Sequence, residues 1–255
     1  MSKSLAVILL LFISFNLQAQ TWELGAFGGG AGYMGDLNQN NPLKISGLAG
    51  GAFVKRNFDG YWALKLSYTY GQIKGADSLS GNLQDRNRNL SFSTRLNEVS
   101  LTGEFNFMEY VPSVSKNIYT PYIFAGIAYT GYNPRATYQG QTYELRTLET
   151  EGKSYSNSTI AVPFGVGIKY NIAGRLSLGA ELGYRTAYTD YLDDVSGVYA
   201  DKSKLGSAIS VALSDRSVGQ TGTAGTQRGD LRPHDTYMFL GFTISYTFIT
   251  QKCYY

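Results

Sequence analysis

Apolar residues alternate with small or polar residues along Thr236–Phe248, TYMFLGFTISYTF. One parity consists of Met238, Leu240, Phe242, Ile244, Tyr246 and Phe248. Because side chains alternate between the two faces of a strand, this pattern predicts a strand with one wholly apolar face that ends in aromatic residues. Such a face suits lipid, and a weakly polar opposite face suits a barrel lumen. We interpret the segment as the closing strand of a transmembrane β-barrel.

Eight segments have the length of membrane-crossing strands. They cover residues 22–34, 44–55, 61–72, 92–107, 119–131, 159–170, 175–188 and 234–249. A tilted strand needs about nine to eleven residues to cross a bilayer. The alternation recurs in the third, fourth, sixth and seventh segments, whereas the first, second and fifth are rich in Gly and Ala and do not define a lipid face. The sequence therefore predicts an all-β fold, a closed eight-stranded antiparallel transmembrane barrel.

The connections between these segments alternate in length. Short ones cover 56–60, 108–117 and 171–174, and long ones cover about 73–91, 132–158 and 189–233. Tight periplasmic turns and long external loops are typical of barrels with both termini in the periplasm, so we predict that orientation. A soluble barrel such as a lipocalin would instead place its apolar residues inside. The last loop is rich in Ser, Gly and Thr, and we expect it to lie outside the cooperative sheet and to be dispensable for folding.

Composition separates this chain from most soluble enzymes. It contains 30 Gly, 21 Tyr and 13 Phe, against one Cys and one His. Gly permits close approach of strands, and Tyr forms the aromatic girdles of membrane barrels. Residues 1–19, with Lys3 ahead of a short apolar run, predict a cleaved secretory signal peptide, which leaves 20–255 as the barrel domain in the outer membrane. The formal net charge of +3 is too small to indicate a nucleic-acid partner.

Charged residues on the inward parities predict a filled lumen. They are Lys65, Glu98, Glu104, Lys169, Glu181 and Arg185. An eight-stranded barrel is only wide enough for side chains to fill it. Because an unpaired buried charge is costly, these residues are expected to form ion pairs with one another. The barrel is therefore predicted to be a plugged scaffold that conducts no ions.

Catalytic and nucleotide-binding motifs are weak in this sequence. Residues 30–35 fit the G-x-G-x-x-G spacing, but a loop follows them in place of the helix that would hold a pyrophosphate. His234 has Asp235 beside it, yet adjacent residues of a strand point to opposite faces, so no catalytic triad is indicated. We predict that the protein is not an enzyme and uses no cofactor or small-molecule substrate.

An acidic cluster offers the only candidate metal ligands that the sequence suggests. Asp190, Asp193 and Asp194 lie within TDYLDDVSG. Carboxylates at this density could hold Ca²⁺, but the spacing of an EF-hand is absent. We expect these residues to cap turns or to pair with arginines such as Arg228 and Arg232, and we predict no metal site beyond this weak candidate.

The turn 108–117 is longer than the joining of two antiparallel strands requires. Its apolar residues and the aromatic residues of the tail 250–255 are predicted to dock a periplasmic partner, because Met and aromatic residues are enriched in interfaces. The predicted partner-binding residues are Met108, Tyr110, Val111, Val114, Tyr254 and Tyr255.

Several longer segments resemble the PorG-like family of outer-membrane β-barrels of Bacteroidota, which is typified by a component of the type IX secretion system. They are GGGAGYMGDLN, YGQIKGADS, RNLSFSTRLNEVSLTGEFNF, TPYIFAGIAYTGYNP, VPFGVGIKY, TDYLDDVSG and DTYMFLGFTISYTF. The resemblance implies a non-catalytic barrel that anchors or organises the periplasmic lipoprotein ring of that machinery. The alternative is a stand-alone surface barrel whose external loops serve adhesion or ligand binding.

Overall fold

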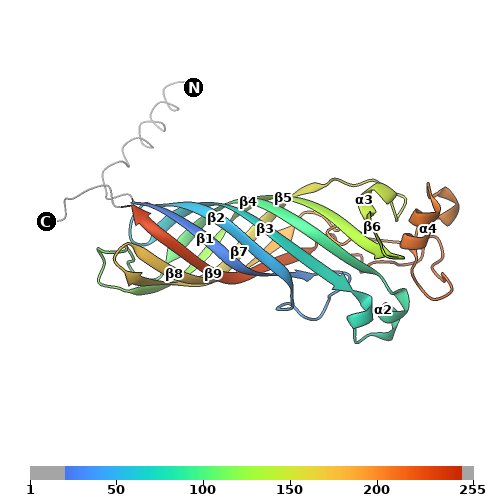
Figure 1. The fold of residues 1–255 in the computed structure, drawn as a ribbon, viewed down its shortest axis with the longest axis horizontal. Coiled ribbons are helices and arrows are strands. Elements are labelled where there is room, and N and C mark those ends of the chain that lie inside the picture. The colour runs from blue at the N-terminus through green and yellow to red at the C-terminus, as the bar shows by residue number, and fades with distance from the viewer. Residues whose placement is uncertain (1–20, 249–255) are drawn as a thin grey trace, which may run out of the picture.

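Antiparallel strands that pair with their neighbours in sequence make up most of the protein. The structure is a computed structural model, and it describes residues 21–248. The longer strands are β1 (Thr21–Met34), β2 (Ile45–Asn57), β3 (Trp62–Ala76), β4 (Ser91–Asn106), β5 (Tyr119–Tyr138), β7 (Ser158–Ala173), β8 (Leu176–Ala187) and β9 (Thr236–Phe248). Each pairs with the next, and β9 pairs with β1, so these eight strands of the described chain close into a barrel (Figure 1). The predicted fold class is confirmed. The predicted signal peptide lies outside the described residues.

The short helices and a small strand gather at one end of the barrel (Figure 1). They are η1 (Asp77–Leu79), α2 (Leu83–Arg88), β6 (Gln141–Glu144), α3 (Leu145–Leu148), η2 (Lys202–Lys204) and α4 (Ala208–Ser214). We call this the helical end, and the opposite end, with connections 58–61, 107–118 and 174–175, the short-turn end. Within residues 21–248, no helix has the length and apolar character needed to cross a membrane.

The ranges predicted as external loops contain more regular structure than expected. Strands β3 and β4 both extend into the range 73–91, and β5 continues beyond residue 131 to form a hairpin with β6. At this hairpin Gln139 and Gly140 have φ angles of 51° and 79°. Positive φ at both central residues gives a turn whose twist matches that of the paired strands. The prediction of a loop throughout 132–158 is therefore wrong, because backbone pairing continues past the apolar span.

The predicted lipid-facing parity is present on the outer surface. In β4, Val99 and Leu101 are exposed, whereas Glu98 and Glu104 are buried. The same division holds in β3 and in β7, where the apolar parity is outside and the parity that carries Lys65 or Lys169 is inside. The alternation therefore predicted the lumen-facing side correctly in the strands where bulky apolar residues alternate with charged residues.

One residue of the closing strand departs from this expectation. Met238 is only 1% exposed, although it shares its parity with lipid-facing residues of β9. It lies opposite Gly32 of β1. On the neighbouring strand β8, the Tyr184 hydroxyl donates a hydrogen bond of 3.1 Å to the carbonyl oxygen of Pro42. The β1–β2 connection thus folds against the outside of the barrel near the helical end.

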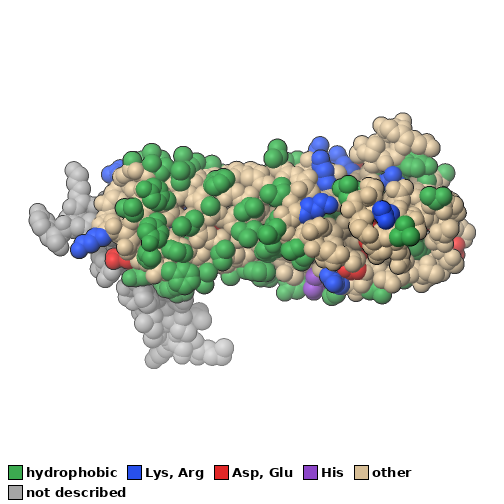
Figure 2. Space-filling view, turned by 90° about the horizontal axis from the view of Figure 1, so that it is seen from below, with side chains coloured by type: hydrophobic (Ala, Val, Ile, Leu, Met, Phe, Trp, Pro, Cys, Tyr) green, Lys and Arg blue, Asp and Glu red, His purple; other side chains and the backbone are tan. Residues whose placement is uncertain are grey.

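An apolar belt with aromatic edges surrounds the barrel. Figure 2 shows apolar side chains along the flank and charged side chains towards the two ends. Exposed aromatic residues near the short-turn end include Trp22, Trp62, Phe107, Tyr119, Tyr170 and Phe248, and those near the helical end include Tyr68, Tyr70, Tyr129 and Tyr188.

The height of this belt fits a lipid bilayer. Tyr70 pairs with Asn97 of β4 and so marks the upper level of the belt, whereas Phe107 marks the lower level. The strand between Asn97 and Phe107 is about 33 Å long, or about 25 Å along the axis at the usual tilt. This is the height of the apolar band in outer-membrane barrels. The chain is an outer-membrane β-barrel.

Candidate functional site

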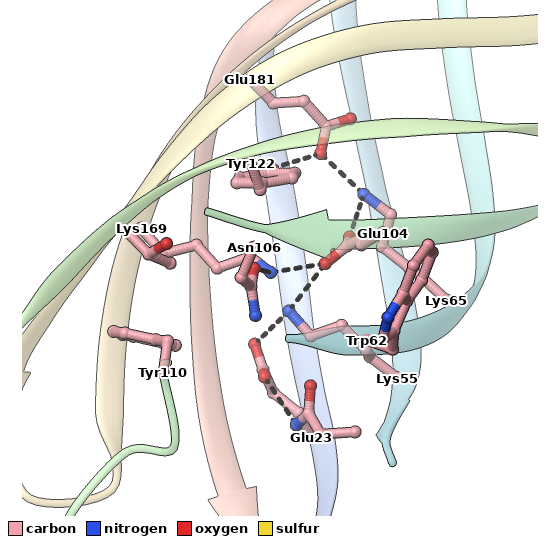
Figure 3. A network of polar contacts seen from close by, with 12 residues as sticks. Glu23, Lys55, Trp62, Lys65, Glu104, Asn106, Tyr110, Tyr122, Lys169 and Glu181 are labelled. Atoms are coloured by element: carbon pink, nitrogen blue, oxygen red, sulfur yellow. Dashed lines mark hydrogen bonds and ion pairs between the residues drawn. The ribbon is translucent and has the colours of Figure 1, made fainter. Parts of the chain in front are cut away.

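The lumen near the short-turn end is filled by an ion-pair network centred on Glu104 (Figure 3). The Glu104 carboxylate lies 2.6 Å from the Lys169 ammonium, 3.1 Å from Lys65 and 3.4 Å from Lys55. Lys65 also contacts Glu181 at 2.6 Å, and Lys55 contacts Glu23 at 2.9 Å. All of these side chains are buried, so each charge depends on its partners for compensation.

A second buried cluster lies closer to the helical end. Arg185 forms an ion pair of 3.2 Å with Glu98. The Tyr237 hydroxyl donates a hydrogen bond of 2.7 Å to the same carboxylate and lies 2.6 Å from the hydroxyl of Thr130. The structure thus brings Arg185 and Glu98 together in one cluster, and Lys65, Glu104, Lys169 and Glu181 in the other.

Aromatic rings fill the space between the two clusters. The Arg185 guanidinium stacks over Phe239 at 4.5 Å, and the Lys65 ammonium lies 5.1 Å from the centre of the Phe124 ring. These contacts place cations on the electron-rich faces of the rings. A cavity of about 20 Å³ lies among these side chains. This volume holds about one water molecule.

Glycine residues leave room for the aromatic side chains of the lumen, and this gives a stability prediction. A methyl group added at Gly167 would overlap the ring of Tyr122. We expect Gly167→Ala to destabilise the folded barrel by about 1–3 kcal/mol, the usual cost of overpacking a core. The measurement is the urea midpoint of the refolded protein. Gly28→Ala is the matched control, because nothing lies within 4 Å of the added methyl group, and an equal shift in both variants would contradict the prediction.

Sequence reasoning missed two members of the lumen network, Glu23 and Lys55. Both belong to strands β1 and β2, whose Gly and Ala residues hide the alternation. With them, the buried charges of the described strands are balanced at four carboxylates and four cations: Glu23, Glu98, Glu104 and Glu181 against Lys55, Lys65, Lys169 and Arg185. A charged residue in a Gly-rich strand was the signal available, since a charge that cannot face lipid must face the lumen.

The turn between β4 and β5 does not present all the residues predicted to dock a partner. Tyr110 is 4% exposed, and its hydroxyl lies 2.7 Å from that of Ser177 inside the barrel. It therefore covers the lumen at the short-turn end, and its prediction as an exposed docking residue is wrong. Met108 and Val111 are partly buried, whereas Val114 is exposed. Tyr254 and Tyr255 lie outside the described residues.

Residues 189–233 fold into an ordered cap over the helical end. Leu192 and Leu213 are buried, and the Leu192 carbonyl accepts a hydrogen bond of 2.6 Å from Thr94 of β4. The guanidinium of Arg228 lies 2.9 Å from Glu151 and donates a hydrogen bond of 2.7 Å to the carbonyl oxygen of Asp194. The segment is therefore packed and encloses a buried polar and apolar core of its own, and its independence from the cooperative sheet stays a prediction.

The predicted acidic trio does not form a single site. Asp194 accepts hydrogen bonds from Thr150 and Tyr155 and lies 3.8 Å from Arg228. Asp193 accepts a hydrogen bond of 2.5 Å from Tyr33. Asp190 instead approaches two carboxylates that sequence reasoning did not select. They are those of Asp36 and Asp230.

Burial perturbs the carboxyl groups of this cap. It raises the pKa of Asp36 to about 7, with repulsion from Asp230 as the next contribution. Burial likewise raises the pKa of Asp190 to about 7, and that of Asp194 to about 6 despite the attraction of Arg228. The pKa of Asp193 is well above its usual range because the side chain is buried and Asp235 lies nearby. The cap therefore contains more buried carboxyl groups than its arginines pair with.

A polar groove of about 540 Å³ opens beside this cap. It is lined on one side by α2 and on the other by residues of the 189–233 segment. Its lining includes the amide side chains of Asn82, Gln84, Asn87 and Gln227 and the ring of Tyr199. Amide groups and an aromatic face offer hydrogen bonds and stacking to a hydroxylated ligand.

A family described as "Domain of unknown function (DUF6089)" matches residues 2–208. The chain belongs to this family. No curated protein matches the chain at a significant level.

Solved structures similar to this DUF6089 protein are bacterial outer-membrane barrels. A major outer membrane protein from Thermus thermophilus has 13% identity and a TM-score of 0.46, with 91% of this chain and 100% of that chain covered. The N-terminal β-barrel domain of Pseudomonas aeruginosa OprF has 15% identity and a TM-score of 0.42, with coverages of 91% and 98%. Ail of Yersinia pestis, in complex with a heparin analogue, has 12% identity and a TM-score of 0.39, with coverages of 90% and 97%. We infer no ligand, partner or activity from these similarities.

The histidine of this DUF6089 protein lies at the rim of the helical end. The His234 ring packs edge-to-face on Tyr188, with 5.0 Å between the ring centres. The neighbouring Asp235 is buried and accepts hydrogen bonds from the backbone N–H of Leu192 and from the Tyr33 hydroxyl. The two side chains therefore belong to different environments, although both residues precede β9 and the alternation of strand faces does not apply to them.

Proposed function

We propose that this DUF6089 protein is a sealed, non-catalytic scaffold of the outer membrane that serves type IX secretion by organising a periplasmic lipoprotein ring. The observation that carries the scaffold role is the filled lumen, in which Tyr110, the Glu104 network and the aromatic layer succeed one another from the short-turn end. A barrel closed in this way acts through its surfaces. The resemblance of its sequence segments to PorG-like proteins supports the secretion role.

The docking surface for that ring lies at the short-turn end in this proposal, with that end in the periplasm. Val114 is 40% exposed and Ile118 lies beyond it on the same turn, also exposed. Tyr110 anchors the turn from inside the lumen, so less conformational order is lost when a partner binds. An apolar, pre-ordered turn is therefore available for contact beyond the membrane edge.

Crosslinking in the cell envelope tests this proposal. Val114→Asp should reduce the recovery of crosslinked periplasmic lipoproteins at least about tenfold, which corresponds to a loss of about 1.4 kcal/mol of binding free energy. Val218→Asp is the control, since Val218 is exposed at the helical end. Equal recovery from both variants would exclude this turn as the docking surface. Absence of lipoproteins from the wild-type sample would contradict the secretion role itself.

A sealed lumen also predicts no ion conductance. The refolded barrel should form no stable open channels in planar bilayer recordings, because ion pairs and rings occupy the lumen. A parallel recording of a known porin in the same bilayer verifies that channels can be detected. Stable conductance from the purified wild-type protein would mean that the lumen opens in the membrane.

The groove beside α2 favours a second function, the capture of a hydroxylated ligand at the cell surface. Amide side chains that line an open groove hydrogen-bond sugars without requiring charge. A glycan array probed with the refolded protein, compared with a Tyr199→Ala variant, distinguishes this function from the scaffold role. Binding that is lost in the variant supports capture, and absence of wild-type binding contradicts it.

A further inference from the structure

Three carboxylates from distant parts of the sequence meet beneath the external cap. Asp36 comes from the β1–β2 connection, whereas Asp190 and Asp230 come from opposite ends of the 189–233 segment. One oxygen of each lies within 4.8 Å of the others. Carboxylates repel one another, so such a convergence costs free energy unless a bound proton or a cation neutralises them.

An unsatisfied acceptor gives a second, independent indication of a ligand. Asp36 is 2% exposed, and its Oδ1 accepts a hydrogen bond from the backbone N–H of Asp230. Its Oδ2 is buried and has no hydrogen-bond partner. Buried carboxylate oxygens are nearly always hydrogen-bonded or bound to a cation, because leaving one unpartnered costs about 1–3 kcal/mol or more.

Two nearby arginines are committed to other acceptors, and a third pairs with Asp230. Arg88 binds Asp77 through two hydrogen bonds of 2.8 Å and donates others to backbone carbonyls. Arg228 binds Glu151 and Asp194. Arg232 reaches Asp230 at 3.4 Å from an exposed position.

The remaining balance of charge is negative. Within residues 21–248, neither Asp36 nor Asp190 forms an ion pair with a lysine or arginine. The buried carboxyl groups of Asp193 and Asp235 lie close by, and burial raises the pKa of both well above the usual range. Within the described residues, the exposed Arg232 beside Asp230 is thus the one arginine that forms an ion pair with the three converging carboxylates.

We propose that Asp36, Asp190 and Asp230 form a Ca²⁺ site that joins the β1–β2 connection to both ends of the external cap. Ca²⁺ takes oxygen ligands at about 2.3–2.6 Å, so it reaches oxygens up to about 5 Å apart. Mg²⁺ requires about 2.0–2.1 Å in a stricter octahedron, which the observed spread fits less well. Water molecules complete the coordination at this partly open position beside the groove. The inference does not depend on the secretion role.

The first test is calorimetric titration of the refolded, EDTA-treated full-length protein with CaCl₂ alone and with MgCl₂ alone. We expect Ca²⁺ to bind with a Kd on the order of 10⁻⁴ to 10⁻³ M, the range of extracellular calcium modules, and Mg²⁺ to bind more weakly. No heat of Ca²⁺ binding at millimolar concentration would overturn the proposal. Equal affinity for the two ions would overturn the assignment to Ca²⁺.

The second test uses variants and a structural readout. Asp36→Asn and Asp230→Asn should each weaken Ca²⁺ binding at least about tenfold. Asp201→Asn should leave it unchanged, since Asp201 is an exposed acid of the same segment. Ca²⁺ should also slow cleavage of residues 189–233 by proteinase K in the wild type and in Asp201→Asn, but not in Asp36→Asn.

Gel mobility before and after heating verifies that each variant contains a folded barrel. If Asp36→Asn does not fold, the titrations of the wild type and of Asp230→Asn decide the question. Wild-type affinity in a folded Asp36→Asn or Asp230→Asn variant would overturn the proposal.

Discussion

Replacing Glu104 with Gln should destabilise the folded barrel by about 3–5 kcal/mol, the usual cost of removing one partner from a buried ion pair. Glu104 contacts the ammonium groups of Lys55, Lys65 and Lys169, and the substitution leaves them with only Glu23 and Glu181 as anionic partners. The measurement is the urea midpoint of the refolded protein, followed by tryptophan fluorescence and by gel mobility with and without heating.

A charge-matched double variant separates lost charge balance from lost packing. Glu104→Gln combined with Lys169→Met removes one ion pair and restores neutrality, so it should be less destabilised than Glu104→Gln alone, since neutral replacements of whole pairs are often tolerated. The control Glu109→Gln, at an exposed position of the β4–β5 turn, should change stability by less than about 0.5 kcal/mol. A Glu104→Gln barrel as stable as the control would show that the network does not hold the lumen together.

Replacing Arg228 with Ala should open the external cap while the barrel stays folded. The substitution leaves Glu151 and Asp194 buried beside each other without their guanidinium partner, which costs about 3–5 kcal/mol. Strand pairing in the barrel does not involve this side chain, so the effect is local unfolding of residues 189–233. In EDTA, proteinase K should therefore cleave this segment about a hundredfold faster or more than in the wild type.

Mass spectrometry of the fragments locates the cuts, and heat-dependent gel mobility reports on the barrel. Lys204→Ala removes a cation from the same segment, but one that is 81% exposed, and its cleavage rate should match the wild type. If Arg228→Ala is cleaved no faster than Lys204→Ala, the cap is not held by this buried arginine. If the barrel itself unfolds, the cap and the strands form one cooperative unit.

Sequence patterns were sufficient wherever bulky apolar and charged residues alternate. In β3, β4 and β7 a one-residue shift would place Lys65, Glu104 or Lys169 in lipid, so the cost of burying a charge there determines the face. In β1 and β2 the small residues fit either face. There the charges of Glu23 and Lys55 were the signal for the lumen face, and their pairing with neighbouring strands places both in the network.

The packing of residues 189–233 could not be predicted from the sequence. Their Ser, Gly and Thr content is typical of a mobile loop, and the few apolar residues among them carry no recognisable period. In the structure Leu192 packs against β4, and Arg228 meets Glu151 from the connection that precedes β7. Contacts between residues so far apart in sequence leave no local pattern from which to predict them.

The sequence by itself determined the class of fold and the number of barrel strands. It also determined which face of the charge-containing strands meets lipid. These features depend on the two-residue period of a strand and on the cost of placing a charge in lipid. Tertiary structure alone decided that Tyr110 covers the lumen, that residues 189–233 form a packed cap, and that Asp190 meets Asp36 and Asp230. These arrangements depend on which distant segments share the same end of a closed barrel. These segments come close together only when all the barrel strands have paired.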